Sequence, residues 1–162
     1  EVCFPDTNSD DDIVLHQFQP AQPSRTEETR KRSEISEGDQ LPLCPVPLTP
    51  RLIISTALAT RDFQDVHHDR DAAHEKGSKD IFMNILSTAG ITSRWLGDWA
   101  GNNVTFEDLK IQLGAPNYPY DTMTMSGSVQ TLNDDGSITV CFNGDNKLGS
   151  HVKGTATLRF TD

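Results

Sequence analysis

The pattern of apolar and polar positions divides the chain into a mainly helical part followed by a part made of strands. Between residues 81 and 96, apolar side chains recur near the spacing of a buried helix. We predict a helix over 80–96, with Asp80 as its N-cap and Gly97 as its C-terminal stop, because these residue types favour helix ends. Gly90 weakens an isolated helix, so we attribute it to close packing against another element.

Four later segments alternate between apolar and polar residues in the manner of half-buried strands, with turn-forming sequences between them. These segments are 105–113, 122–131, 137–142 and 153–160. Upstream, the alternating prolines of 41–50 predict an extended edge segment, whereas 51–60 is compatible with a helix or a strand. A buried helix followed by several antiparallel strands predicts an α+β domain.

The polar residues before the domain predict an attached arm. Residues 20–37 carry Pro, Ser and mixed charges with almost no large apolar side chains. Such a stretch buries too little surface to offset the entropy of ordering it, so we interpret it as a linker. Residues 1–19 form an N-terminal extension with a short apolar run at 13–18, and the main domain is expected to cover 38–162.

Composition restricts the classes of function. A formal net charge of -10 argues against nucleic-acid binding, because backbone phosphates require a basic face. No stretch has the apolar length of a membrane span, and the first residues lack a signal-peptide pattern. The three cysteines, Cys3, Cys44 and Cys141, form no C-x-x-C pair or disulfide framework. We therefore expect reduced thiols in a cytoplasmic protein.

Asp62 and His67 are the candidate catalytic residues. A tight turn could aim a carboxylate and an imidazole into one cleft, where they could share and deprotonate a water. On spacing alone, such a pair is more often a cap or a surface contact. His68 and Asp69 fit solvent-facing neighbours or a cap for the helix-like segment that follows. The His and Asp residues of 67–74 lack recognisable zinc-site spacing, so we predict no metal.

The passage Asp62-Phe-Gln-Asp-Val-His67 resembles a family motif. MaoC-like and R-specific enoyl-CoA hydratases carry Asp-x-Asn-Pro-x-His shortly before the buried helix of a hot-dog fold, in which an antiparallel sheet wraps around that helix. The likeness continues in 113–122 and 146–152, which resemble later family passages. The chain departs from the broad family inside the motif, where Gln-Asp replaces the usual Asn-Pro.

Three sequence segments are similar to one branch of this family: TRDFQDVHHDRDAA, GSKDIFMNIL and DWAG. That branch is the small subunit of actinobacterial hydratases that act on steroid side-chain CoA thioesters. The resemblance implies a hydro-lyase that adds water across the α,β double bond of an enoyl-CoA. It implies no cofactor besides the CoA of the substrate.

The resemblance also implies roles for individual residues. Asp62 and His67 would hold one water beside Cβ, and His67, assisted by Asp62, would remove its proton. The backbone amide of Ile85 would stabilise negative charge on the thioester oxygen. The residues expected to contact the substrate or its CoA are Asn84, Lys147 and Gly149. The residue type of Gly149 independently predicts a turn or bulge.

Two other functions remain open from the sequence. A hot-dog thioesterase would use a carboxylate near the helix start, where Asp80 is expected. A non-catalytic scaffold subunit would complete the site of a partner, although retention of Asp62 and His67 favours the active half. The resemblance implies a heteromer with a second MaoC-like subunit. It further suggests that this partner carries an OB-fold and zinc-ribbon domain that contacts a thiolase, and residues 1–19 faintly resemble the tail of such a domain.

Overall fold

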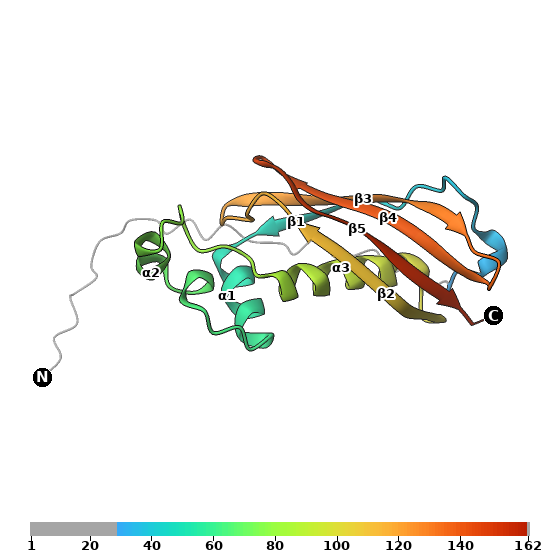
Figure 1. Ribbon diagram of the computed structural model, residues 1–162, viewed down its shortest axis with the longest axis horizontal. Helices are drawn as coiled ribbons and strands as arrows, with labels where there is room; N and C mark the ends of the chain where they lie inside the picture. The colour runs from blue at the N-terminus through green and yellow to red at the C-terminus, as the bar shows by residue number, and fades with distance from the viewer. Residues whose placement is uncertain (1–28, 162) are drawn as a thin grey trace, which may run out of the picture.

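The computed structural model of the chain describes residues 29–161, which adopt the predicted α+β hot-dog fold. A five-stranded antiparallel sheet forms one layer, and the long helix α3 lies beneath it (Figure 1). In chain order the elements are η1 (Arg32–Glu34), β1 (Cys44–Leu48), α1 (Pro50–Ala59), η2 (Asp65–His67), α2 (Arg70–Glu75), α3 (Ile85–Ala100), β2 (Val104–Leu113), β3 (Asp121–Leu132), β4 (Ser137–Asn146) and β5 (Gly149–Phe160). The predicted extension over 1–19 and the first part of the predicted linker lie outside the described residues.

The strand order is β1-β3-β4-β5-β2, and every neighbouring pair is antiparallel. Within the described sheet, β1 pairs with β3 alone, so the proline-rich segment lies on an edge, as predicted. Its prolines, Pro45 and Pro47, lack the N–H group that a central strand would need. The other edge strand is β2, whose side chains are mostly exposed.

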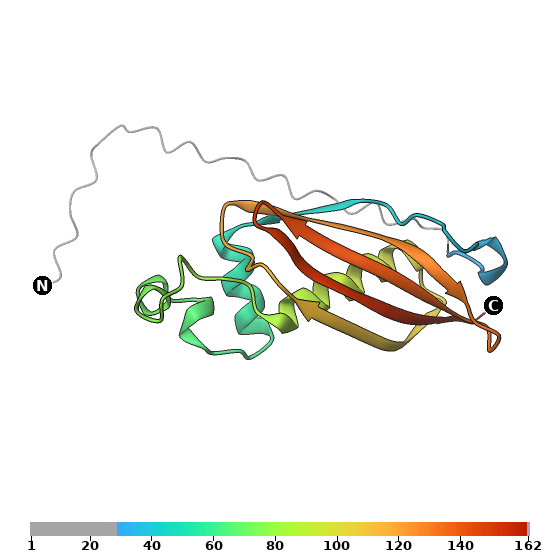
Figure 2. The same ribbon diagram turned by 45° about the horizontal axis from the view of Figure 1, so that its top comes forward.

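The ambiguous segment 51–60 is helical because its start has strong helix signals. Thr49 caps α1 by accepting a hydrogen bond from the Leu52 amide, and Pro50 occupies the first turn. Ile53 and Ala57 are fully buried on its inner face. In Figures 1 and 2, α1, α2 and the loops around them gather at one end of the sheet, beside the start of α3.

The start of the central helix differs from the prediction. Asp80 does not cap α3, because its carboxylate accepts hydrogen bonds from Arg70 and from the Ile81 amide. The N-cap is Asn84, whose side chain accepts from the Ser87 amide. Both Asp and Asn favour this position, but the amides after Asp80 donate outside the helix, Phe82 to the Val66 carbonyl and Met83 to the Asn117 carbonyl, so the helix begins only after Asn84.

The end of the central helix is also later than predicted. The helix continues through Gly97, and Gly101 caps it with φ of 90°, a conformation that favours glycine. The guanidinium of Arg30 donates to the Trp99 carbonyl at 3.0 Å and lies over the Trp99 ring. A cation at a helix C-terminus is stabilising. Within residues 29–161 no helix is long and apolar enough to cross a membrane.

The described part of the predicted linker, 29–37, lies against the domain. Ile35 is buried in the core, and the Arg30 amide donates to the Ala100 carbonyl. These contacts give this segment the apolar and backbone partners that its composition did not reveal.

The core lies between α3 and the concave face of the sheet. Trp95, Leu96 and Trp99 contribute the helix side. The sheet side is formed by Met123, Met125, Val129, Ile138, Val140, Phe142, Val152, Ala156 and Leu158. This packing holds α3 in a fixed position, so the groups at its first turn have a fixed place as well.

The glycines of the domain have different reasons to be glycine. A Cβ at Gly154 of β5 would collide with the Lys110 carbonyl of β2 and lie 2.8 Å from the Phe142 ring. At Gly90, by contrast, a Cβ would meet nothing within 4 Å among the described residues. The predicted packing reason for Gly90 is therefore wrong for the described part of the chain.

Opposite stability changes are expected from the same substitution at these two positions. Gly90→Ala should stabilise the purified chain by about 0.5–1 kcal/mol, because alanine restricts the unfolded backbone and favours helix. Gly154→Ala should destabilise it by about 1–3 kcal/mol, because the pairing of β2 with β5 must shift. Chemical denaturation of both variants measures these changes, and equal effects would contradict the packing described here.

Candidate active site

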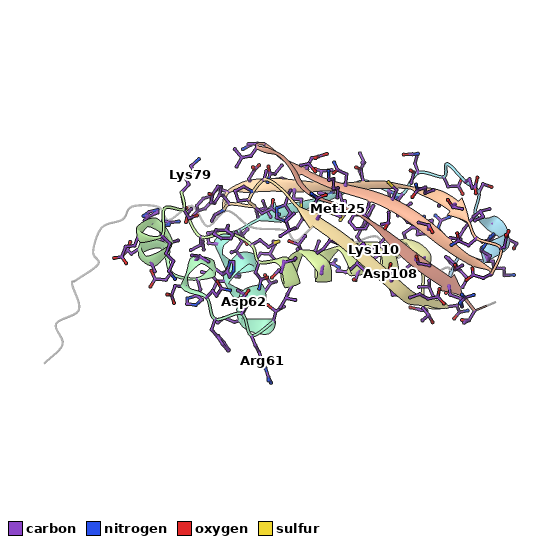
Figure 3. The ribbon with its side chains drawn as sticks, viewed as in Figure 1. Arg61, Asp62, Lys79, Asp108, Lys110 and Met125 are labelled. Atoms are coloured by element: carbon purple, nitrogen blue, oxygen red, sulfur yellow. The ribbon has the colours of Figure 1, made fainter. Side chains whose placement is uncertain are left out.

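Asp62 is positioned by the end of α1. Arg61 adopts the left-handed conformation, with φ of 56°, and its amide donates to the Leu58 carbonyl. The Asp62 amide donates to the Ala57 carbonyl at 3.0 Å. This is the Schellman pattern of helix termination, in which the residue after the left-handed one leaves the helix in a defined direction. Arg61 points away from the domain in Figure 3, beside the labelled Asp62.

His67 lies on the short helix η2 and is buried, with 5% of its surface exposed. Its Nδ1 lies 2.7 Å from the Phe82 carbonyl oxygen. A carbonyl can only accept, so Nδ1 carries the proton in this bond and Nε2 of the neutral ring has a free lone pair. The Phe82 ring packs edge-on against the imidazole, with centroids 5.0 Å apart. Both contacts restrict the rotation of the imidazole.

The two candidate catalytic groups meet, as the hypothesis of a shared water requires. His67 Nε2 lies 3.4 Å from Asp62 Oδ2. When the imidazole is neutral, both atoms are acceptors and cannot bond to each other directly. One water can donate a hydrogen to each of them, and its oxygen lone pair is then free to attack an electrophile.

Asn84 connects this pair to the central helix. Its side chain donates to Asp62 Oδ2 at 2.9 Å and to Thr60 Oγ1 at 3.0 Å, and its oxygen accepts from the amide and hydroxyl of Ser87. The bond from Asn84 is the main reason that the pKa of Asp62 is lowered from its ordinary value, with smaller contributions from the Gln64 amide and His67. Asp62 is therefore ionised at neutral pH.

The role predicted for Asn84 changes with this geometry. The residue is 3% exposed, and its amide group is fully engaged by protein partners. It has no donor left for a CoA group, so its contacts make it a support for Asp62 instead. The sequence signal that could have indicated Asn84 as the cap of α3 is an Asn directly before an apolar run, which is a helix N-cap pattern.

The first turn of α3 presents backbone donors beside Asn84. Asn84 accepts from the third amide of the helix, Ser87, and no hydrogen bond from the Ile85 or Leu86 amide is found among residues 29–161. The side chains of Ile85 and Leu86 are 48% and 51% exposed. Unpaired amides at a helix N-terminus stabilise developing negative charge, which agrees with the predicted role of the Ile85 amide.

Lys147 and Gly149 lie in the β4–β5 turn. Gly149 has φ of 120°, so the prediction of a turn is confirmed. The Lys147 ammonium lies 3.7 Å from Asp121 Oδ1 and is largely exposed. His151, just after this turn, bonds to Thr88 in the first turns of α3, so the turn lies at the same end of the sheet as Asn84. The predicted contacts of Lys147 and Gly149 with CoA stay predictions.

The neighbours of His67 have structural partners. The Asp69 side chain caps α2 by accepting from the Ala72 amide, as one of the predictions allowed. His68 Nε2 lies 3.2 Å from the Phe63 carbonyl. Within the described part of the chain, no group of three or more His, Cys, Asp or Glu residues could hold a metal ion.

Similarity to known proteins supports the same interpretation. No family model matches the chain. It is 54% identical over 113 residues, covering 70% of this chain and 87% of the relative, to the 3-oxo-4,17-pregnadiene-20-carboxyl-CoA hydratase beta subunit of Mycobacterium tuberculosis. The chain belongs to the MaoC-like hydratases.

Solved structures of this family share the fold. The ChsH1-ChsH2 complex of Mycobacterium tuberculosis includes a chain that superimposes with a TM-score of 0.76 and 50% identity, covering 78% of this chain and 98% of that one. The (R)-hydratase from A. caviae involved in PHA biosynthesis superimposes with a TM-score of 0.72 at 18% identity, covering 78% of this chain and 98% of that one. The second likeness concerns the fold alone.

Two supports of this MaoC-like site were not predicted from the sequence. The Phe82 carbonyl, which fixes the His67 ring, is a backbone group that no residue pattern indicates. The buried Asn117 is the other: its carbonyl accepts from the Met83 amide, and its side chain accepts from Asn146. Asn117 thus attaches the loop before α3 to the β4–β5 turn region.

The left-handed Arg61 gives a stability prediction. Arg61→Gly should stabilise the chain by about 0.5–1 kcal/mol, because relief of the left-handed strain outweighs the larger backbone entropy of glycine in the unfolded state. Arg61→Val should destabilise it, since a β-branched side chain tolerates this conformation least. Thermal unfolding of the two variants gives the comparison. Shifts of the same sign would mean that Arg61 is not held in this conformation.

Proposed function

We propose that this chain is the subunit of an enoyl-CoA hydratase that supplies the acid–base pair. The observation that carries the proposal is the meeting of Asp62 and His67 Nε2 at 3.4 Å, with the imidazole proton held on the opposite nitrogen by the Phe82 carbonyl. The first-turn amides of α3 lie next to the Asn84 side chain that binds Asp62. Asn84 thus supports both the acid–base pair, through Asp62, and the backbone amides that would bind the oxyanion.

In the proposed reaction, a water donates its hydrogens to Asp62 and His67 Nε2. Its oxygen adds to Cβ of the α,β-unsaturated thioester as Nε2 takes the proton, and the π electrons move through Cα toward the thioester oxygen. The Ile85 amide stabilises the resulting negative charge, and one such donor is typically worth about 3 kcal/mol of barrier. The adjacent Asp62 stabilises the imidazolium, and the proton then passes to Cα, which completes the addition of water.

The substrate that we propose is a steroid side-chain enoyl-CoA. The name of the Mycobacterium tuberculosis relative, a 3-oxo-4,17-pregnadiene-20-carboxyl-CoA hydratase, supports this substrate class. Large apolar side chains are exposed beside the pair: Phe63 directly follows Asp62 and is 66% exposed, and Ile85 directly follows Asn84. An exposed apolar surface next to polar groups suits an apolar ligand or partner.

A second subunit completes this proposal. The relative is a beta subunit, and the similar structure comes from a complex of two proteins, ChsH1 and ChsH2. Among the strands of residues 29–161, the edge strand β2 pairs with β5 alone, and an edge of this kind suits association with a second subunit. We propose a heteromer with a second MaoC-like subunit. Whether that partner has an OB-fold and zinc-ribbon domain that contacts a thiolase stays a prediction.

The thioesterase alternative is less favoured by the geometry. Its expected carboxylate, Asp80, lies before the helix start and is bound by Arg70. The residue at the helix start is the neutral Asn84. The proton in the proposed hydration moves from water to His67 and then to the substrate, so the proposal includes no cofactor besides the CoA of the substrate. We also propose a cytoplasmic location, where the free thiols of Cys44 and Cys141 would stay reduced.

Removal of either catalytic group should abolish most hydration. Asp62→Asn and His67→Gln should each lower kcat by about 10²- to 10⁴-fold, because general acid–base catalysis is lost. In the assay, the chain is assembled with its partner subunit, and the ultraviolet absorbance of the enoyl thioester is followed as the substrate is consumed. Matched controls are the exposed Asp65→Asn and the half-buried His68→Gln, two neighbours on the same loop. Both controls should stay close to wild type.

The same assay separates the alternatives. Hydration leaves the thioester intact, whereas release of free CoA thiol at the rate of substrate loss would favour a thioesterase. Full turnover by the Asp62→Asn and His67→Gln complexes would favour a scaffold subunit. Either result would overturn the proposed function.

A further inference from the structure

One amide group performs two tasks at the junction of the pair and the central helix. The oxygen of Asn84 accepts from the Ser87 amide and so caps α3, while its nitrogen donates to Asp62 Oδ2 at 2.9 Å. The same nitrogen donates to Thr60 Oγ1 in the last turn region of α1. The amide is planar, so these bonds set the carboxylate and the first-turn amides of α3 in one fixed arrangement.

We infer that Asn84 is a positioning residue for the hydration, which holds the Asp62 carboxylate at a fixed place relative to the Ile85 and Leu86 amides. The inference rests on the proposed function. In an enoyl thioester, the carbon that water attacks and the oxygen that gains charge belong to one rigid conjugated group. The base and the oxyanion donors must therefore be held at a matching separation, and small displacements lower the rate.

Capping alone does not explain an asparagine here. Ser, Asp and Asn cap helices about equally well, because all three have a side-chain oxygen that can accept from a first-turn amide. Only Asn adds an N–H donor that can reach Asp62 at the same time. An ionised Asp would add a second negative charge beside Asp62, and a Ser hydroxyl is too short for both bonds. The residue type thus fits the double task.

The electrostatics of Asp62 agree with this inference. The Asn84 bond is the largest of the influences that lower the pKa of the carboxyl. The titratable groups that act on it are the imidazoles of His67 and His68, both from the loop after α1. From the α3 side, the described residues contribute the neutral Asn84 amide. A negative charge introduced at position 84 would therefore lie directly beside the Asp62 carboxylate and repel it.

Two capping substitutions test the inference in the chain assembled with its partner subunit and a steroid side-chain enoyl-CoA. Asn84→Ser keeps a capping oxygen but loses the donor to Asp62. It should leave the Tm close to wild type and lower kcat by about 10- to 100-fold. KM should change by less than about threefold, because the positioned water acts mainly in the transition state.

Asn84→Asp supplies a readout that a purely structural role would not change. At neutral pH the introduced carboxylate repels Asp62 and cannot donate to it, so kcat should fall. As the pH decreases toward 5, the introduced carboxyl gains a proton and can donate again. The ratio of variant to wild-type activity should therefore rise on acidification.

Two control variants separate the effect of Asn84 on Asp62 from an effect of helix capping. Thr49→Ser exchanges one capping residue for another at α1, remote from the pair, and should keep wild-type activity. The double variant Asp62→Asn/Asn84→Ser should be no slower than Asp62→Asn, because Asn84 acts through Asp62. Activities of Asn84→Ser and Asn84→Asp within about threefold of wild type at neutral pH would overturn the inference.

The Asp62→Asn complex separates this inference from the proposed function. If Asp62→Asn retains full activity, the proposed acid–base pair is wrong and the inference falls with it. If Asp62→Asn is inactive while both Asn84 variants are active, the pair stands and only the positioning role is wrong. Should Asn84→Ser fail to fold, the pH-dependent ratio of Asn84→Asp still decides the question.

Discussion

The hydrogen bond between His67 Nδ1 and the Phe82 carbonyl determines what the site can do. It holds the ring proton on the nitrogen that faces the protein, so the lone pair of Nε2 faces Asp62. With the opposite tautomer, Nε2 would donate to the carboxylate and could not accept a proton from water. The carbonyl therefore converts a buried histidine into a base with a defined direction.

Three chain segments must be held together for the site to form, and each is fixed by the end of an element. The Schellman turn at Arg61 directs Asp62 away from α1, η2 presents His67, and Asn84 begins α3. Asn117 then fastens the loop before α3 through the Met83 amide. The catalytic groups lie on short connections, but the packed core under the sheet fixes the ends of those connections.

The sequence was sufficient for the parts of this arrangement that depend on local pattern. Period-two alternation identified β2, β3, β4 and β5, alternating prolines indicated β1, and the motif from Asp62 to His67 indicated the pair. The predicted start of α3 was wrong because Asp80 and Asn84 are equally good caps by residue type, and the choice depends on the Phe82 and Met83 amides, which donate to carbonyls of other segments. The Phe82 carbonyl has no side-chain signature at all. Local chemistry was thus predictable, whereas contacts between segments required the fold.

The exposed apolar side chains beside the pair link catalysis to assembly in the proposed hydratase. Charge stabilisation by backbone amides is strong only where bulk water is excluded, because water screens and competes for the same donors. In the single chain, the side chains of Phe63, Ile85 and Leu86 are 66%, 48% and 51% exposed. A surface that covers them would bury apolar area and lower the local dielectric in one step. In the proposed heteromer, subunit association and acyl binding would therefore strengthen the interactions that lower the barrier, so assembly and catalysis would depend on the same apolar surface.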